Sequence, residues 1–373
     1  MLGGALFEAG EMKQAEAVLT EGAEMAAAAG QPATRARIHV LLADLHNLQD
    51  QGNAETLTEC GAATAVLEDE GDLEGLAEAW ILTGRLRFWL GDSSASQQAL
   101  ERAMAYARQA GSHRAWANAA FWLARTLMTL PVPADAAIAR TEQLLRAVSG
   151  DPWAEAGLLK PLAVLYAFVG RFADAKEASA RASAVYGRSG AEFDYAMSVV
   201  VAGEIELIAG NPAAAECLLR EACEALRALD DRGFLGSAVA TLAEAVYQQG
   251  RLDEAQAMTE EAETLAGADD IDTQTAWRAT RAKVLAQRGQ PLAAQQLAAE
   301  AEALVSPTSW AVIKAGMLMD KAEVNRLAGA PGQAAASLRA ALEIYQDRHA
   351  SALVQRAKTA LASLTSQPGT KPA

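Results

Sequence analysis

The chain has 373 residues, a formal net charge of −15 at pH 7 and 51% apolar residues. Alanine fills roughly a quarter of the positions, a bias that favours closely packed helices over β-sheets, which need more β-branched and aromatic side chains. The acidic balance argues against a general nucleic-acid or anionic-membrane surface, because basic residues are needed to bind phosphate groups. The composition therefore predicts a helical protein that binds neither nucleic acid nor membrane directly.

The sequence shows no recognisable membrane span or secretory leader. The longest apolar run, residues 161–170, is about half of what a bilayer span requires, and residues 1–12 carry acidic rather than basic side chains. Cys60, Cys217 and Cys223 form no CxxC pair, which favours a reducing cytoplasm. We expect a cytoplasmic protein with all three cysteines buried.

A repeat of about 40 residues runs along the chain. Glycines that end one apolar stretch and precede the next recur with this spacing: Gly10, Gly52, Gly91, Gly170, Gly210, Gly250, Gly289 and Gly329. Pro131 stands at the one place in this series where the glycine is missing. A fixed period of this length is the signature of a solenoid, and it divides the chain into about nine units.

Each unit reads as two helices joined by a turn. In the unit with the clearest pattern, residues 153–169 carry apolar side chains at helical spacing, Gly170 interrupts them, and a second apolar stripe begins at Ala175. Glycine suits the left-handed conformation that ends a helix. Neither helix buries its apolar face alone, so neighbouring hairpins must stack.

The two ends of the array differ. Residues 1–9 are half of a first helix, which predicts a truncated first hairpin, a cut or internal start, and self-association through its uncovered face. At the other end, residues 350–364 read as one capping helix and residues 366–373 as a flexible tail. The predicted domains are thus a repeat array over 1–349 and a cap with a disordered tail over 350–373.

Small residues recur at fixed places in each unit. Alanine stands five and twelve residues after most turn glycines. A small residue stands seven before the glycine, as Gly84, Ala163, Gly203, Ala243, Ala282 and Ala322. This spacing resembles the tetratricopeptide repeat, in which small residues lie where paired helices touch. The resemblance implies an all-α fold, a right-handed α-solenoid of about nine hairpins with a C-terminal capping helix.

The units are about six residues longer than the usual tetratricopeptide repeat. Residues 153–159, 170–175 and 277–286 look most like the region after the ATPase in bacterial proteins that join a class III nucleotidyl cyclase, an ATPase and such repeats. Related layouts occur in large LuxR-type regulators. The resemblance implies a regulatory module acting on an attached or partner ATPase or cyclase. A stand-alone scaffold and the effector region of an ATP-dependent transcriptional regulator stay open as alternatives.

The sequence contains no recognisable set of catalytic or metal-ligating residues, and we predict no catalytic, cofactor or metal site. It contains no GxxxxGK[ST] phosphate loop and no GxSxG nucleophile turn. His39 and His46 are seven residues apart on one predicted helix, about 10 Å, which is too far for one metal ion to bridge. Glu221, Glu260 and Glu261 read as a solvated outer face rather than as acid–base pairs.

The candidate binding site is the inner groove of the array, lined by first helices. The side chain six before each turn glycine is expected to point into it, which gives His46, Arg85, Arg125, Val164, Glu204, Glu244, Lys283 and Glu323. Basic and aromatic residues meet in the N-terminal half: Arg85, Phe88, Trp89, Phe121, Arg125, Lys160 and Phe168. Glu204 and Glu244 follow them.

Cations interleaved with aromatic rings in a concavity can hold an acidic peptide, a carboxylate ligand or a nucleotide phosphate. The predicted function is therefore non-catalytic binding of a protein segment or a small acidic effector. Packing between helices is the alternative for the aromatic residues, and solvation is the alternative for the arginines. Other tryptophans, Trp122 among them, are predicted to fill joints between units.

Overall fold

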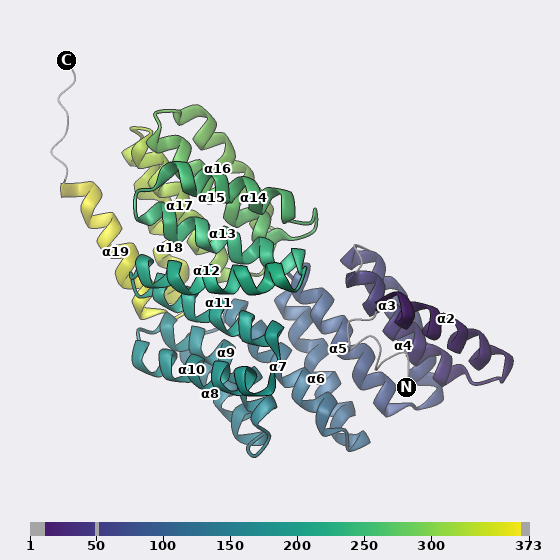
Figure 1. Cartoon of the computed structure of the whole chain (residues 1–373). Helices are drawn as coiled ribbons and strands as arrows, with labels where there is room; N and C mark the ends of the chain where they lie inside the picture. Colours follow the sequence, from purple (N-terminus) through teal and green to yellow (C-terminus); the bar gives the residue numbers. More distant parts are fainter. Residues whose placement is uncertain (1–11, 49–51, 367–373) are drawn as a thin grey trace. The chain divides into compact units, whose positions relative to one another are not determined.

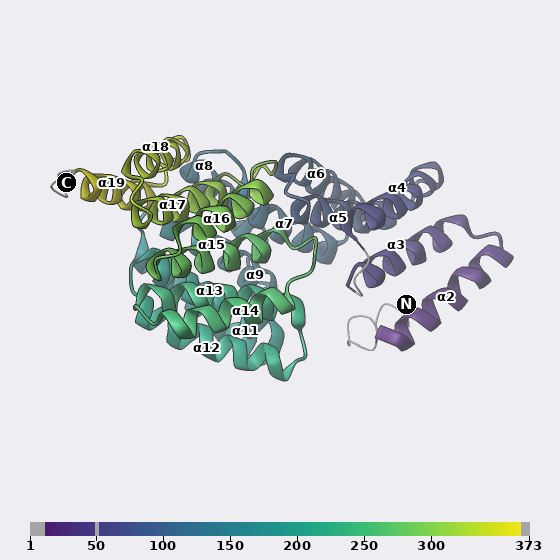
Figure 2. The same cartoon turned by 90° about the horizontal axis from the view of Figure 1, so that it is seen from above.

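The computed structural model describes residues 12–48 and 52–366, which form 18 helices with no strand among them (Figures 1 and 2). In chain order these are α2 (Met12–Ala28), α3 (Pro32–Leu48), α4 (Asn53–Glu70), α5 (Leu73–Trp89), α6 (Ser93–Ala110), α7 (His113–Thr129), α8 (Ala134–Ala147), α9 (Pro152–Phe168), α10 (Phe172–Ser189), α11 (Glu192–Ile208), α12 (Pro212–Ala228), α13 (Arg232–Gln248), α14 (Leu252–Leu265), α15 (Ile271–Gln287), α16 (Pro291–Val305), α17 (Ala311–Leu327), α18 (Pro331–Asp347) and α19 (Ser351–Ser366). The predicted all-α solenoid class is confirmed.

The chain forms two compact units, unit 1 up to Thr126 and unit 2 from Leu127, with the boundary inside α7. The predicted cap corresponds to α19. The truncated first hairpin and its self-association concern residues 1–9, which lie outside the described residues, as does the tail from 367. No helix in the described ranges is long and apolar enough to cross a membrane.

Turn glycines end the first helix of most hairpins as predicted. Six of them, from Gly91 to Gly329, have φ between 73° and 82°, a left-handed backbone that costs glycine little. After α9, the Gly170 N–H donates to the Ala167 carbonyl at 3.0 Å, and the Arg171 N–H donates to the Tyr166 carbonyl at 2.9 Å. These two bonds cap carbonyls that would otherwise lack partners at the helix end.

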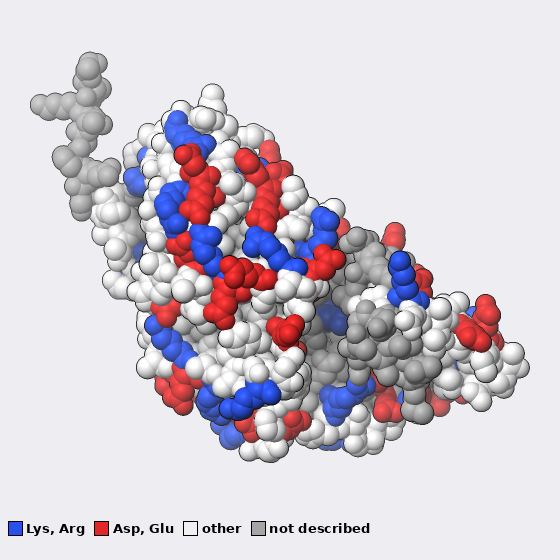
Figure 3. All heavy atoms as spheres, in the orientation of Figure 1, with Lys and Arg blue, Asp and Glu red and all other residues white. Residues whose placement is uncertain are grey.

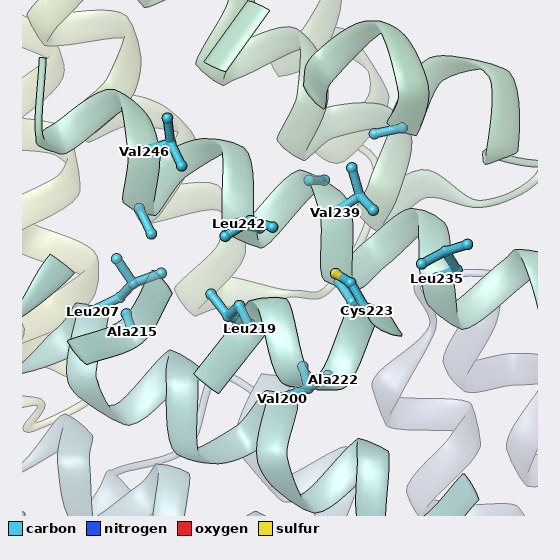
Figure 4. Packing of buried hydrophobic residues seen from close by; sticks show 14 of the residues in the cluster. Val200, Leu207, Ala215, Leu219, Ala222, Cys223, Leu235, Val239, Leu242 and Val246 are labelled. Carbon is cyan, nitrogen blue, oxygen red and sulfur yellow. The ribbon is translucent and has the colours of Figure 1, made fainter. Parts of the chain in front are cut away.

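The small residue seven before the turn glycine lies where the two helices of a hairpin touch. A Cβ atom at Gly203 would lie 2.6 Å from the Leu219 Cγ, and one at Gly84 would lie 2.5 Å from the Leu100 Cγ. Leu219 belongs to the buried cluster that joins α11, α12 and α13 (Figure 4). Glycine at these two places therefore makes room for a leucine from the second helix.

Charged side chains link neighbouring second helices on the outer face. Arg227 of α12 lies 2.6 Å from Glu261 of α14. Figure 3 shows acidic and basic side chains alternating over this part of unit 2. Glu261 was predicted to be solvated, and the ion pair shows that part of the outer acidity is locally neutralised.

The cysteine prediction holds for two of the three residues. Cys60 and Cys223 are buried, whereas Cys217 is exposed. The buried stripe of α12 runs through Ala215, Leu219 and further residues at helical spacing, and residue 217 lies on the opposite side of that helix. The prediction that all three cysteines are buried is therefore wrong for Cys217.

Candidate binding site

Charged side chains of unit 2 meet on three successive first helices. Lys283 of α15 lies between Glu244 of α13 and Asp320 of α17, with its Nζ 2.5 Å from the Glu244 Oε2 and 2.6 Å from the Asp320 Oδ1. Helix α15 contacts both α13 and α17, and Figure 2 shows the three as successive layers. One cation thus joins three successive hairpins of unit 2.

The Lys283 side chain is almost fully buried, with 1% exposed. Burial alone would lower the pKa of this ammonium group, but the charges of Asp320 and Glu244 raise the pKa above its ordinary value. Burial likewise opposes ionisation of Glu244, and the charge of Lys283 nevertheless lowers the pKa of this carboxyl. Lys283 and Glu244 therefore form an ion pair at neutral pH.

Neutral polar groups extend this cluster into a network. The Tyr247 hydroxyl donates to the Glu323 Oε1 at 2.7 Å, and the Gln287 amide donates to the Tyr247 hydroxyl oxygen at 3.3 Å. The Thr280 hydroxyl donates to the Glu244 Oε2 at 3.1 Å. Burial raises the pKa of Tyr247, so its hydroxyl keeps the proton that it donates. The orientation of these carboxylates is therefore fixed by hydrogen bonds as well as by charge.

A cavity of about 460 Å³ lies beside this network. It is lined by Glu244, Tyr247, Gln248, Gly250, Gln287, Met319, Asp320, Ala322, Glu323, Arg326, Leu338, Arg356, Ala360, Ser363 and Leu364. Its volume falls in the range of ligand-binding pockets. Arg326 and Arg356 form no salt bridge with any residue that the structure describes. The cavity therefore combines paired charges in its wall with two guanidinium groups that form no salt bridge within 4 Å to a described residue.

Asp320 gives the cavity a titratable group near physiological pH. Burial raises the pKa of its carboxyl to about 6, against the opposing charge of Lys283. A raised folded-state pKa means that this group favours the folded state below its unfolded pKa, and that this contribution is lost as pH rises through about 6. We expect carboxyl-detected NMR titration to give a midpoint near 6 for Asp320. A midpoint near 4, the ordinary value, would contradict this prediction.

The predicted residues of unit 1 come together in a separate cluster. The Arg125 guanidinium lies 5.5 Å from the Phe88 ring, 5.6 Å from the Trp89 ring and 5.5 Å from the Trp122 ring. Trp122 also contacts Phe121, at 5.4 Å between ring centroids. Trp122 therefore belongs to the same cluster as the candidate arginine, in addition to any packing role.

Arg85 lies close to this cluster and is paired within unit 1. Its guanidinium donates to Asp44 of α3, and it lies 5.9 Å from the Trp122 ring. Burial lowers the pKa of Arg85 to about 10. Because Asp44 already neutralises this side chain, Arg85 acts within the fold of unit 1.

The remaining predicted residues of unit 2 lie outside the cavity lining. Lys160 is buried, 3.2 Å from Asp194 and above the Tyr186 ring at 4.9 Å. Phe168 is buried in α9, and Glu204 is half-buried in α11. Of the predicted residues in this unit, Glu244 and Glu323 line the cavity, and these three do not.

Sequence reasoning missed several cavity residues that a simple signal could have found. Tyr247 follows Glu244 by three positions, and Asp320 precedes Glu323 by three, so each shares a helical face with a predicted inward position. Arg326 follows Glu323 by three in the same way. Arg356 has no such signal, because it comes from α19, outside the repeat.

Comparison with known proteins supports the fold. No protein-family model and no curated protein matches the sequence. The chain is similar in structure to a Rap protein complexed with Competence and Sporulation Factor, with a TM-score of 0.64, 14% identity and 97% of each chain covered. It is also similar to yeast Tom70, with a TM-score of 0.51 and 13% identity, covering 89% of this chain and 66% of Tom70.

A tetratricopeptide repeat protein from Parabacteroides merdae matches at a TM-score of 0.43 and 13% identity, over 78% of this chain and 99% of that protein. Together, the helical hairpins and the structural similarity to the Rap protein and Tom70 show that the fold is a tetratricopeptide-like helical solenoid.

Proposed function

We propose that the chain is a non-catalytic interaction module that binds a protein segment in the cavity between α13, α15, α17 and α19. The observation that carries the proposal is the set of cavity charges that form no salt bridge within 4 Å. Among the residues that the structure describes, Arg326, Arg356 and Glu323 form no such bridge, although the charge of Arg356 acts on Glu244 and that of Glu323 acts on Lys283. A ligand that carries both an acidic and a basic group would pair with the guanidinium groups and with the Glu323 carboxylate.

A short peptide segment has the required chemistry. In an extended segment, an acidic side chain can accept bidentate hydrogen bonds from a guanidinium, while a nearby basic side chain pairs with Glu323. A cavity of about 460 Å³ takes a few residues rather than a folded domain. The Rap protein of similar fold forms a complex with Competence and Sporulation Factor, which is in keeping with a bound factor here.

The test uses a fluorescent library of pentapeptides that each contain one glutamate and one lysine at varied spacing. We expect some members to bind, and we expect Arg326→Glu and Arg356→Glu each to weaken the tightest member by about tenfold, or about 1.4 kcal/mol. Arg339→Glu is the matched control, because this exposed α18 residue does not line the cavity. Equal losses in all three variants, or no binding by any library member, would contradict the proposal.

The regulated partner and its activity are proposed from the sequence resemblance alone. We propose that the module regulates an attached or partner ATPase or nucleotidyl cyclase in the cytoplasm, through small changes spread over the interfaces between repeats. The Arg125 cluster of unit 1, with Phe88, Trp89 and Phe121, is proposed as a second contact for an acidic segment or small acidic effector. A stand-alone scaffold and an effector region of a transcriptional regulator remain the alternative settings.

A further inference from the structure

One turn of unit 2 lacks the usual cap and obtains it from a distant residue. At the end of α7, Pro131 occupies the place of the turn glycine and has no N–H to donate. The next N–H, that of Val132, donates to the Leu130 carbonyl instead of reaching back into the helix. The α7 carbonyls that correspond to those capped after α9 belong to Leu127 and Met128.

Arg348, between α18 and α19, supplies the missing donors. Its Nη2 donates to the Met128 carbonyl at 2.9 Å and to the Leu127 carbonyl at 3.4 Å, and its Nη1 donates to the carbonyls of Leu130 and Val132. The side chain is 1% exposed. A cation at the carboxyl end of a helix is also favoured by the helix dipole.

The same segment holds the next helices. The Arg348 carbonyl accepts from the Ala134 N–H at the start of α8, at 2.7 Å. The Ser351 hydroxyl donates to the Val169 carbonyl at 2.9 Å, and His349 lies 3.2 Å from Asp135. Figure 1 shows yellow α19 next to the teal helices of this region, in keeping with the contact between α19 and α9. These contacts, which we call the Arg348 latch, close unit 2 from its last hairpin back to its first.

The latch is continuous with the candidate cavity. Helix α19 starts at Ser351, inside the latch, and one turn later supplies Arg356, followed by Ala360, Ser363 and Leu364, to the cavity lining. The other walls come from α13, α15, α17 and α18. The position of one wall is therefore set by a contact with residues 127–170, far from the cavity in sequence.

We infer that the Arg348 latch regulates the cavity, so that the α19 wall and its Arg356 are in place for a ligand only when the latch is closed. For its ligand, this inference rests on the proposed function. A ligand that contacts both Arg356 and the α17 side chains binds the closed state better and shifts unit 2 toward it. By reciprocity, closing the latch raises the affinity for that ligand by the same factor.

A disulfide can hold the latch shut independently of Arg348. A Cβ atom at position 170 would lie 3.8 Å from the Ala352 Cβ, which is the usual Cβ separation in disulfides. The experiment compares Arg348→Ala alone with Arg348→Ala in a Gly170→Cys, Ala352→Cys chain, oxidised and reduced. All carry Cys217→Ser to remove the exposed thiol. Because Gly170 has φ +78°, the reduced double-cysteine chain with Arg348 intact is the control for backbone strain.

The first readout needs no ligand. Hydrogen exchange is expected to rise about tenfold in the α19 amides of the Arg348→Ala chain, and oxidation of the 170–352 pair should return it to the rate of the chain with Arg348. Unchanged α19 exchange in Arg348→Ala would overturn the inference. If that chain does not fold, Ser351→Ala, which removes only the bond to Val169, takes its place with a smaller expected rise in the same amides.

The second readout uses the tightest Glu/Lys pentapeptide of the library. Arg348→Ala is expected to weaken its binding about tenfold, although Arg348 lies outside the cavity, and the oxidised disulfide should restore it. A loss that the disulfide does not restore overturns the inference while leaving the proposed function intact. If no pentapeptide binds the wild-type chain, the proposed function fails, and the exchange measurement decides the latch by itself.

Discussion

Replacing Lys283 by methionine is expected to destabilise unit 2 by about 3 to 5 kcal/mol, the cost of removing one partner from a buried ion cluster. Methionine fills much of the same space, so the loss comes from Glu244 and Asp320, which keep their places without a cation. Urea unfolding of the wild-type and Lys283→Met chains at pH 7 measures it. The matched control is Lys321→Met. Lys321 lies 2.5 Å from Glu302, but both side chains are 31% exposed. We expect this variant to lose about 1 kcal/mol of unfolding free energy or less.

The loss is expected to depend on pH in a defined direction. Without Lys283, burial raises the pKa values of Glu244 and Asp320, so their folded state binds protons more readily than the unfolded chain. Their contribution to stability is then present at low pH and is lost as pH rises through the raised values. The deficit of Lys283→Met should therefore shrink from pH 7 to pH 5, and adding Glu244→Gln and Asp320→Asn should recover most of it at pH 7. A deficit independent of pH, or equal to that of Lys321→Met, would contradict the ion cluster.

The second large effect concerns the close contact between Gly203 and Leu219. Gly203→Ala is expected to cost about 1 to 3 kcal/mol, because its Cβ would lie 2.6 Å from the Leu219 Cγ. Leu219→Ala should cost about 2 to 5 kcal/mol by leaving a cavity at a fully buried position. In the double variant the new methyl group occupies part of that cavity. The combined loss should therefore be smaller than the two single losses added together.

Denaturant unfolding of the three variants gives the coupling free energy. The control is Gly316→Ala in α17, where the nearest atom to the new Cβ is 3.9 Å away. Since alanine favours helix more than glycine, this control is expected to stabilise the chain by about 0.5 to 1 kcal/mol. Strictly additive losses at Gly203 and Leu219 would show that the two residues do not share one packing constraint.

Much of the fold was predictable because the residues that define the repeat act over short distances in the sequence. A turn glycine, a small residue seven before it and an alanine five after it each act within one hairpin, so their spacing survives in a single sequence. Three residues that stand six before a turn glycine, Glu244, Lys283 and Glu323, come together in one network, and their pointing into an inner groove stays a prediction. Extending that spacing by one helical turn would have added Tyr247 and Asp320.

The parts that sequence reasoning missed depend on contacts between distant segments. Nothing around Arg348 shows that it caps a helix more than 200 residues earlier, and the absence of a turn glycine at Pro131 does not reveal which donor replaces it. The pairing of Arg85 with Asp44 likewise joins two hairpins of unit 1, and the sequence of neither hairpin indicates it. The repeat spacing selected equivalent positions on the first helices but gave no partners for their charged side chains.

Closure of unit 2 also bears on how the chain folds as it is synthesised. In most repeat arrays each unit stabilises its neighbour, so order can grow along the chain as it emerges. Here the end of α7 cannot be capped until Arg348 has been synthesised, and Arg348 lies 218 residues after Leu130. At about 5 to 20 residues per second, that wait lasts roughly 10 to 45 s. Throughout this interval the turn after α7 lacks the Arg348 donors, and the first and last hairpins of unit 2 can complete each other only after residue 348 has been synthesised.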